Sequence, residues 1–252
     1  MKRLLILLLA LVTMTALPGQ PGMLLVGDAA APPPPSADTC GAFVAAGVWK
    51  FFMCHNLGAN TAAVPTTPSW ELIGNYYQWG RNPTCFGIDG TDAPNPCSSP
   101  VYGAAGPWGS TTANDNAGLI TGWNTVLAAN GSWAAIKTAN DPCPSGWRVP
   151  TITEWTGVTN TSLNARIFVG TFTGSATNYS SGIRIGTSLF LPTPGYRHNG
   201  NGALTSRGSD GYYWSSTESG STNAQFMRLI SAGTQISAES RAYAFALRCI
   251  EE

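Results

Sequence analysis

Few side chains in this sequence could carry acid–base, nucleophilic or metal chemistry. The two histidines, His55 and His198, are too few for a three-histidine metal site, so a zinc enzyme is not expected. Cys54 and His55 are adjacent, but neighbours on a strand point to opposite faces and cannot act as nucleophile and base. Residues 88–95 (IDGTDAPN) lack EF-hand spacing and are interpreted as a solvated turn. The sequence contains no GxSxG, P-loop or GxGxxG motif, and we predict no catalytic residue, no metal site and no cofactor.

The N-terminus has the pattern of an export signal. A positive start (MKR) precedes an apolar run over residues 4–17, which Pro18 interrupts before it is long enough to span a bilayer. We predict a signal peptide over residues 1–31 and a stiff proline-rich spacer over residues 32–39. The protein is expected to be exported, as a periplasmic, cell-surface or secreted chain with no membrane span in its mature form. An uncleaved anchor is the alternative.

The cysteines are even in number, which in an exported chain favours disulfides over metal ligands. They are Cys40, Cys54, Cys85, Cys97, Cys143 and Cys249. Six cysteines allow about 15 connectivities. Cys85 and Cys97 bracket a loop rich in Gly, Asp and Pro and are the natural local pair. A bridge from Cys143 to Cys249 would close a loop of about a hundred residues and contribute roughly 4–5 kcal/mol. Cys40 with Cys54 then remains by elimination.

The composition excludes some partner classes. Thirteen basic and thirteen acidic residues give zero formal charge, and charged residues make up 10% of the 252-residue chain. No basic patch or stripe is present, so no nucleic-acid partner is expected. The hydrophobic content of 43% suffices for one core, and 29 glycines and 18 prolines predict many turns and few long helices.

One segment carries a clear helix pattern. Thr151 is predicted to cap a helix over residues 151–158, and Glu154, three residues on, completes a capping box. Trp155 and Val158 would face the core at helical spacing. The short apolar runs that follow, near residues 183–185 and 189–191, are typical of strands.

The last quarter of the chain alternates large apolar residues with short polar runs such as HNGN and ESGSTN. Rigid anchors between small, adaptable polar residues suit a binding surface on a fixed scaffold. In the run 243–249, Tyr243, Phe245, Leu247 and Cys249 share one strand face. An ordinary β-rich core with ordinary turns is the alternative.

Six motifs, in this order, carry a family resemblance: KFFMCHNLGA, YYQWGR, KTANDPCPSGWRVPTITEW, LFLPTPGYR, GYYWSST and RAYAFALRCI. With them the chain resembles the Fibrobacter succinogenes major paralogous domain over residues 40–252. That family is similar to the formylglycine-generating-enzyme branch of the C-type lectin fold. The resemblance implies an α+β, C-type-lectin-like fold with paired N- and C-terminal strands, a small twisted antiparallel sheet, one or two short helices and long ordered loops. It also fits a Cys143–Cys249 bridge.

The C-terminus is similar, in addition, to variable proteins of diversity-generating retroelements. In those proteins a framework like GYR, YWSST and RAY surrounds positions that targeted mutagenesis alters. The resemblance implies a variable binding region at about residues 195–250. Its ligand-binding positions would be His198, Asn199, Asn201, Ser209, Asp210, Tyr212, Asn223, Gln225, Phe226, Arg228, Gln235, Ser237 and Ser240. Their composition is that of a paratope; solvent-facing strand and turn residues are the alternative.

Two activities of the related folds lack their residues here. The Glu-Pro-Asn, Gln-Pro-Asp and Trp-Asn-Asp motifs of calcium-dependent lectins are absent, and a second C-terminal cysteine for formylglycine-generating catalysis is missing. We therefore expect an exported, non-enzymatic protein with a diversifiable C-terminal binding face for a protein or glycan ligand on a cell surface. The alternatives are a structural or adhesive cell-envelope component, or a divergent formylglycine-generating-type enzyme.

Overall fold

The computed structural model describes residues 40–81, 84–86, 95–96 and 123–252. The chain divides into two units, Met1–Ala31 and Pro32–Glu252, and every described residue belongs to the second. The expected signal peptide, the proline-rich spacer, residues 88–94 of the expected turn and the Cys85–Cys97 side chains lie outside the described part.

The first sheet joins the beginning and the end of the described domain. Its antiparallel strands, in the order β1–β2–β16–β6, are β1 (Cys40–Ala45), β2 (Val48–Phe52), β16 (Ile250–Glu251) and β6 (Trp147–Arg148). Ile250 pairs with Phe52 on one side and with Arg148 on the other. This arrangement confirms the expected pairing of N- and C-terminal strands.

Two disulfides brace this sheet. Cys40 and Cys54, with Cα atoms 5.0 Å apart, join the first residue of β1 to the segment after β2. Cys143 and Cys249, with Cα atoms 5.9 Å apart and 106 positions apart in sequence, join the segment before β6 to the residue before β16. Both expected pairs are confirmed.

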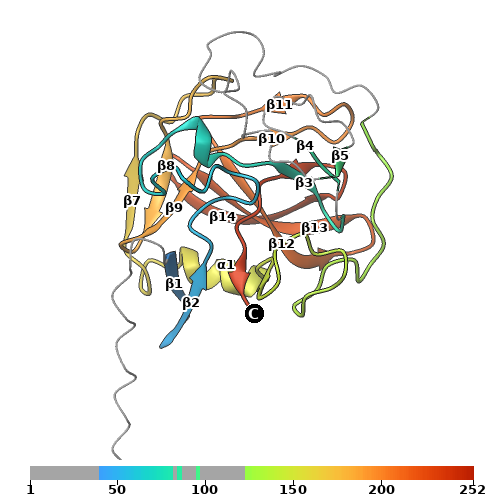
Figure 1. Cartoon of the computed structure of the whole chain (residues 1–252), viewed down its shortest axis with the longest axis horizontal. Helices are drawn as coiled ribbons and strands as arrows, with labels where there is room; N and C mark the ends of the chain where they lie inside the picture. Colours follow the sequence, from blue (N-terminus) through green and yellow to red (C-terminus); the bar gives the residue numbers. More distant parts are fainter. Residues whose placement is uncertain (1–39, 82–83, 87–94, 97–122) are drawn as a thin grey trace, which may run out of the picture. The chain divides into compact units, whose positions relative to one another are not determined.

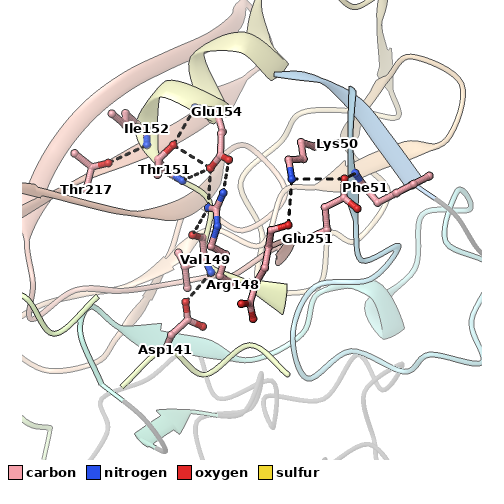
Figure 2. Close-up of polar contacts among 11 residues, drawn as sticks. Lys50, Phe51, Asp141, Arg148, Val149, Thr151, Ile152, Glu154, Thr217 and Glu251 are labelled. Carbon is pink, nitrogen blue, oxygen red and sulfur yellow. Dashed lines mark hydrogen bonds and ion pairs between the residues drawn. The ribbon is translucent and has the colours of Figure 1, made fainter. Parts of the chain in front are cut away.

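The helix α1 (Ile152–Thr159) begins as the sequence predicts. Glu154 donates its backbone N–H to the Thr151 hydroxyl at 3.2 Å, and its carboxylate accepts the Thr151 N–H at 2.7 Å. Arg148 donates to both carboxylate oxygens of Glu154, at 2.9 and 2.5 Å (Figure 2). Burial opposes the ionisation of Glu154, but these hydrogen bonds outweigh it and hold the pKa of Glu154 below its usual value.

A three-stranded antiparallel sheet packs on this helix (Figure 1). Its strands, in order, are β12 (Gly211–Ser219), β13 (Asn223–Ile230) and β14 (Gly233–Ser240). Tyr213 pairs with Met227, so the two side chains share a face, and both are fully buried. The Trp155 ring lies 5.9 Å from the Tyr213 ring, and its Nε1 donates to the Trp214 carbonyl at 3.1 Å. As predicted, Trp155 and Val158 belong to the core.

Two further antiparallel sheets complete the described domain. One consists of β7 (Arg166–Val169), β8 (Gly182–Ile185) and β9 (Leu189–Pro192), which confirms the two predicted strands. The other runs in the order β11 (Leu204–Thr205), β10 (Tyr196–Arg197), β15 (Ala244–Phe245), β3 (Tyr76–Gln78), β4 (Thr84–Phe86) and β5 (Asn95–Pro96). A single 3-10 turn, η1 (Trp70–Leu72), precedes β3.

The expected α+β fold class is wrong. Across residues 40–81, 84–86, 95–96 and 123–252, the chain forms mostly antiparallel strands, and α1 is the one α-helix, only 8 residues long. Short strands separated by Gly-, Ser- and Thr-rich turns give most segments no helical periodicity, so sheets pack on sheets and the domain is all-β. The run 243–249 is likewise not one long strand: β15 is two residues long and lies between β10 and β3.

Four arginines are at most 1% exposed, which is unusual for a charged side chain. Three of them lie over aromatic rings, 4.3–5.4 Å from the ring centroid: Arg197 over Tyr76, Arg207 over Tyr179 and Arg241 over Trp79. The fourth, Arg248, binds backbone and amide oxygens. These cation–π and hydrogen-bonding partners offset part of the cost of taking the guanidinium groups out of water.

Arg248 links three segments of the core. Its Nε and Nη2 donate to the Asn56 side-chain oxygen at 3.0 and 2.8 Å. Its guanidinium also donates to the carbonyls of Met53 at 3.1 Å, Cys54 at 2.6 Å and Phe190 at 2.9 Å. Burial lowers the pKa of Arg248 to about 10, so the group remains charged at neutral pH.

The buried His55 should make stability depend on pH. It is 9% exposed, and its Nε2 lies 2.8 Å from the Ala63 carbonyl. Burial lowers the pKa of His55, the Ala63 hydrogen bond opposes that shift, and Arg248 adds to it. Because the folded pKa lies below the unfolded value of about 6.5, the folded state disfavours the charged ring; stability is complete above pH 6.5 and falls as pH drops through the folded pKa.

We therefore expect His55→Gln to reduce the loss of unfolding free energy between pH 7 and pH 5. Urea denaturation of both proteins at the two pH values measures this difference. If His55→Gln loses as much stability on acidification as the unmodified chain, the imidazole is not the group responsible.

Candidate functional site

One face of the β12–β13–β14 sheet carries five of the predicted ligand-binding residues. Cross-strand partners lie on the same side of a sheet. Tyr212, Arg228 and Gln235 form one row across the three strands. Phe226 pairs with Ser237 in the next row. The structure thus brings together positions that are up to 25 residues apart in sequence, Tyr212 and Ser237.

Exposure separates these five residues into three kinds. Gln235 and Ser237 are exposed, and Tyr212 and Arg228 are half-buried. Phe226 is 3% exposed and stacks on the Tyr212 ring at 5.5 Å, so it holds that ring in place and offers little surface itself.

Asp210 holds Arg228 in place. The Asp210 carboxylate is 8% exposed and accepts hydrogen bonds from Arg228 Nε at 3.0 Å and Nη2 at 2.5 Å. The Tyr212 hydroxyl also donates to Asp210, at 3.3 Å, and the Arg228 guanidinium lies 5.4 Å from the Tyr212 ring centroid. Burial opposes the charge on Arg228, but the Asp210 hydrogen bond outweighs it and raises the pKa of Arg228. Burial also raises the pKa of Tyr212.

Three predicted residues point to the other side of the sheet or lie at its end. Gln225 alternates with Phe226 along β13 and therefore faces the helix side; its Nε2 donates to the Glu218 carbonyl at 3.4 Å. Asn223 and Ser240 pair with each other where β13 begins and β14 ends. They do not join the row of Tyr212 and Arg228.

The remaining predicted residues lie outside the sheet. The turn between β10 and β11 contains His198, Asn199 and Asn201. Of these, His198 contacts the Tyr243 ring, with the two ring centroids 5.5 Å apart. Asn199 accepts a hydrogen bond from the Trp123 ring at its backbone carbonyl, at 2.9 Å. Ser209 lines a separate depression of about 420 Å³.

A small aromatic pocket opens beside this face. It has a volume of about 50 Å³ and is lined by Tyr196, Tyr212, Glu239, Tyr243 and Phe245, which we call the aromatic pocket. Phe245 is 1% exposed, the three tyrosines are half-buried and Glu239 is exposed. Burial and, next, the nearby Glu239 carboxylate raise the pKa of the Tyr243 hydroxyl.

Backbone pairing positions the pocket residues. Ala246 donates its N–H to the Tyr212 carbonyl at 3.0 Å and accepts from the Trp214 N–H at 3.2 Å, which fixes β15 beside β12. On the other side of β15, Arg197 of β10 pairs with Ala244. The two pairings place side chains from β10, β12 and the segment around β15 next to one another.

Of the five pocket residues, only Tyr212 was predicted from the sequence to bind ligand. Tyr196 and Tyr243 belong to the framework motifs GYR and RAY, and Phe245 and Glu239 were not assigned to the binding set. The signal in the sequence that could have indicated the pocket is its tyrosines, because the apolar ring and polar hydroxyl of tyrosine suit a half-buried pocket wall. Glu239 lies two residues from Ser237 on the same face of β14, and strand alternation would have found it.

A larger depression of about 520 Å³ lies elsewhere, between the end of β2, the loop 61–65 and Trp147. It is lined by His55 but by none of the predicted ligand-binding residues. Within the described ranges, no three or more His, Cys, Asp or Glu side chains gather where they could hold a metal ion. No helix in the part of the chain that the structure describes is long and apolar enough to cross a membrane.

Comparison with known proteins gives the family. Neither the curated proteins nor the solved structures contain a match to this chain. The similarity to retroelement variable proteins and to the formylglycine-generating branch therefore stays a prediction. The family described as Fibrobacter succinogenes major domain matches residues 43–251, which is most of the sequence. The chain belongs to the Fibrobacter succinogenes major domain family.

Proposed function

We propose that this chain is an exported, non-enzymatic protein that binds a protein or glycan ligand on a cell surface. Binding would use the outer face of the β12–β13–β14 sheet, which we call the binding face: Tyr212, Arg228, Gln235, Ser237 and Glu239. The observation that carries the proposal is this row of half-exposed and exposed side chains, set on a sheet whose opposite face is core. The two described disulfides are compatible with export.

The scaffold next to the binding face is rigid, which favours recognition. Trp214 stacks on Phe245 at 4.0 Å, and both rings are buried. A preorganised surface loses little conformational entropy when a ligand binds. Tyr and Ser with a fixed Arg offer large, stiff contacts next to adaptable hydrogen bonds, as in antibody paratopes.

The binding face could also be diversified without loss of the fold. Gln235 and Ser237 are exposed, and the β13–β14 ladder holds through backbone atoms whatever their side chains are. Retroelement diversification requires positions of this kind. A reverse transcriptase gene beside this one, with a near-copy of its 3′ end that differs only at adenines, would support diversification of the binding face. A locus without both would contradict diversification but not ligand binding.

The Ser237→Arg substitution tests the binding face directly. We expect it to reduce binding by about tenfold or more, because a long cation in the middle of the face blocks contact and disturbs the Arg228 charge pattern. The assay is binding of the exported chain to an array of purified cell-surface polysaccharides and envelope proteins. Ser231→Arg, in the exposed turn of the same hairpin, is the matched control.

Both variants should keep the melting temperature of the unmodified chain, since both serines are exposed. Equal binding by Ser237→Arg and Ser231→Arg would contradict the proposed function. So would an unmodified chain that binds no component of the array.

A further inference from the structure

The rings of the aromatic pocket line a small, partly open depression and do not form a flat platform. Tyr196 meets Tyr212 at 4.7 Å with an interplanar angle of 68°, and it meets Tyr243 at 5.5 Å and 74°. The buried Phe245 contacts all three tyrosines, at centroid distances of 5.1–6.1 Å. Phe245 is therefore the floor, and Tyr196 stands at a steep angle to each of the other two tyrosines, which form the remaining walls. A sugar ring stacks best on one exposed flat ring, which this pocket does not offer.

The charge at the pocket is negative. Two arginines lie nearby, but each has its own carboxylate: Arg228 binds Asp210, and the fully buried Arg241 lies 3.8 Å from Glu218. Glu239, which lines the pocket, forms no ion pair within the described residues. A cation that enters the pocket thus meets one uncompensated carboxylate, and an anion is repelled.

The size of the pocket restricts the ligand to a compact group. A volume of about 50 Å³ corresponds to roughly three to five water molecules at about 10–15 Å³ each. One small head group fits, whereas a whole sugar or an aromatic side chain does not. The rest of a longer ligand would lie over the adjacent binding face.

We propose that the aromatic pocket binds a quaternary ammonium group, such as that of choline or of a trimethylated lysine. The tyrosine rings would attract the cation through their negative faces, and Glu239 would supply the countercharge. A primary ammonium is strongly hydrated and needs acceptors for three N–H groups, so aromatic walls suit it less well. This inference rests on the proposed binding function and names the chemistry of one ligand group.

The test is titration of the full chain with choline, followed by calorimetry and by tyrosine resonances in NMR spectra. The neutral control is 3,3-dimethylbutan-1-ol, which has the shape of choline without its charge. We expect choline to bind with a dissociation constant in the range of about 10 µM to 10 mM, and the neutral analogue to bind at least about tenfold more weakly. Ethanolamine, which carries a primary ammonium, should also bind more weakly than choline.

Two variants locate the site. Tyr243→Leu removes a wall ring but retains apolar volume, and Glu239→Gln removes the countercharge; each should weaken choline binding by about 2- to 30-fold. Glu252→Gln, an exposed acid outside the pocket, should not change it. Glu239 is exposed, so Glu239→Gln stays informative if Tyr243→Leu lowers the melting temperature.

Two ligand sources share this chemistry, and a second pair of titrations separates them. Stronger binding of phosphocholine than of a trimethyllysine peptide would assign the pocket to choline-bearing surface molecules. The reverse order would assign it to a methylated protein. Either order supports the ammonium proposal.

The inference is overturned if choline and its neutral analogue bind equally, if neither binds, or if Glu239→Gln and Tyr243→Leu bind choline like the unmodified chain. Its failure is distinct from failure of the proposed function. If Ser237→Arg alone loses binding to the array and choline does not bind, the proposed binding face is supported and the pocket proposal is rejected. If choline binding depends on Tyr243 and Ser237→Arg binds the array like the unmodified chain, the pocket proposal is supported and the proposed binding face is rejected.

Discussion

Replacing both Cys143 and Cys249 with alanine is expected to lower the free energy of unfolding by about 5 kcal/mol. The bridge spans 106 positions, so it removes much of the freedom of the unfolded chain. In the chain-entropy relation, a loop of this length contributes about 4.8 kcal/mol at 25 °C. The two sulfur-bearing side chains are 5% and 0% exposed, so alanine also leaves small cavities. Urea denaturation without reductant measures the loss.

The second described disulfide provides the matched control. Cys40 and Cys54 are 14 positions apart, for which the same relation gives about 3 kcal/mol. The double alanine variant of this pair should therefore lose roughly 2 kcal/mol less unfolding free energy than the double variant of Cys143 and Cys249. If the two double variants lose the same stability, loop length is not what makes the Cys143–Cys249 bridge the stronger brace.

Arg248→Met is expected to cost about 3–5 kcal/mol of unfolding free energy, although methionine is similar in length and more apolar. The substitution removes the donors for the Asn56 side-chain oxygen and for the carbonyls of Cys54 and Phe190, and it leaves these acceptors in the core. Each buried acceptor without a partner costs about 1–3 kcal/mol. Arg184→Met, at a half-exposed arginine on β8, should change stability by less than about 1 kcal/mol.

Arg248→Lys separates the charge from the geometry. A lysine keeps the cation but has three donors on one nitrogen, so it cannot serve acceptors on three separate segments at once. We expect it to lose most of what Arg248→Met loses, again by urea denaturation. A lysine variant as stable as the unmodified chain would show that the charge alone matters at this position.

Local patterns in the sequence predicted the local parts of this structure. Thr151 and Glu154 act within one turn of helix, so the capping box could be recognised without any tertiary contact. The alternation of Tyr212 with Tyr213 likewise depended only on strand geometry. The fold class could not be predicted in this way, because it depends on which short strands pair with one another, and the resemblance implied an α+β domain instead of an all-β one.

The candidate site shows the same limit. Tyr212 and Phe226 lie on the same face of one sheet, and the sequence gives no reason to treat them differently. Phe226 is buried because Phe245, from β15, covers it at 4.9 Å. That contact depends on the pairing of β15 between β10 and β3, which no local pattern specifies. The aromatic pocket was missed for this reason.

The four buried arginines have a consequence for proteolysis. Trypsin-like enzymes cut after arginine and lysine, and in this chain there are only 13 such residues. Arg197, Arg207, Arg241 and Arg248 are at most 1% exposed, so these four bonds are closed to a protease while the domain is folded. All four lie in the region that carries the binding face. A trypsin-like protease that meets the folded protein can cut at these four bonds only after the domain has opened.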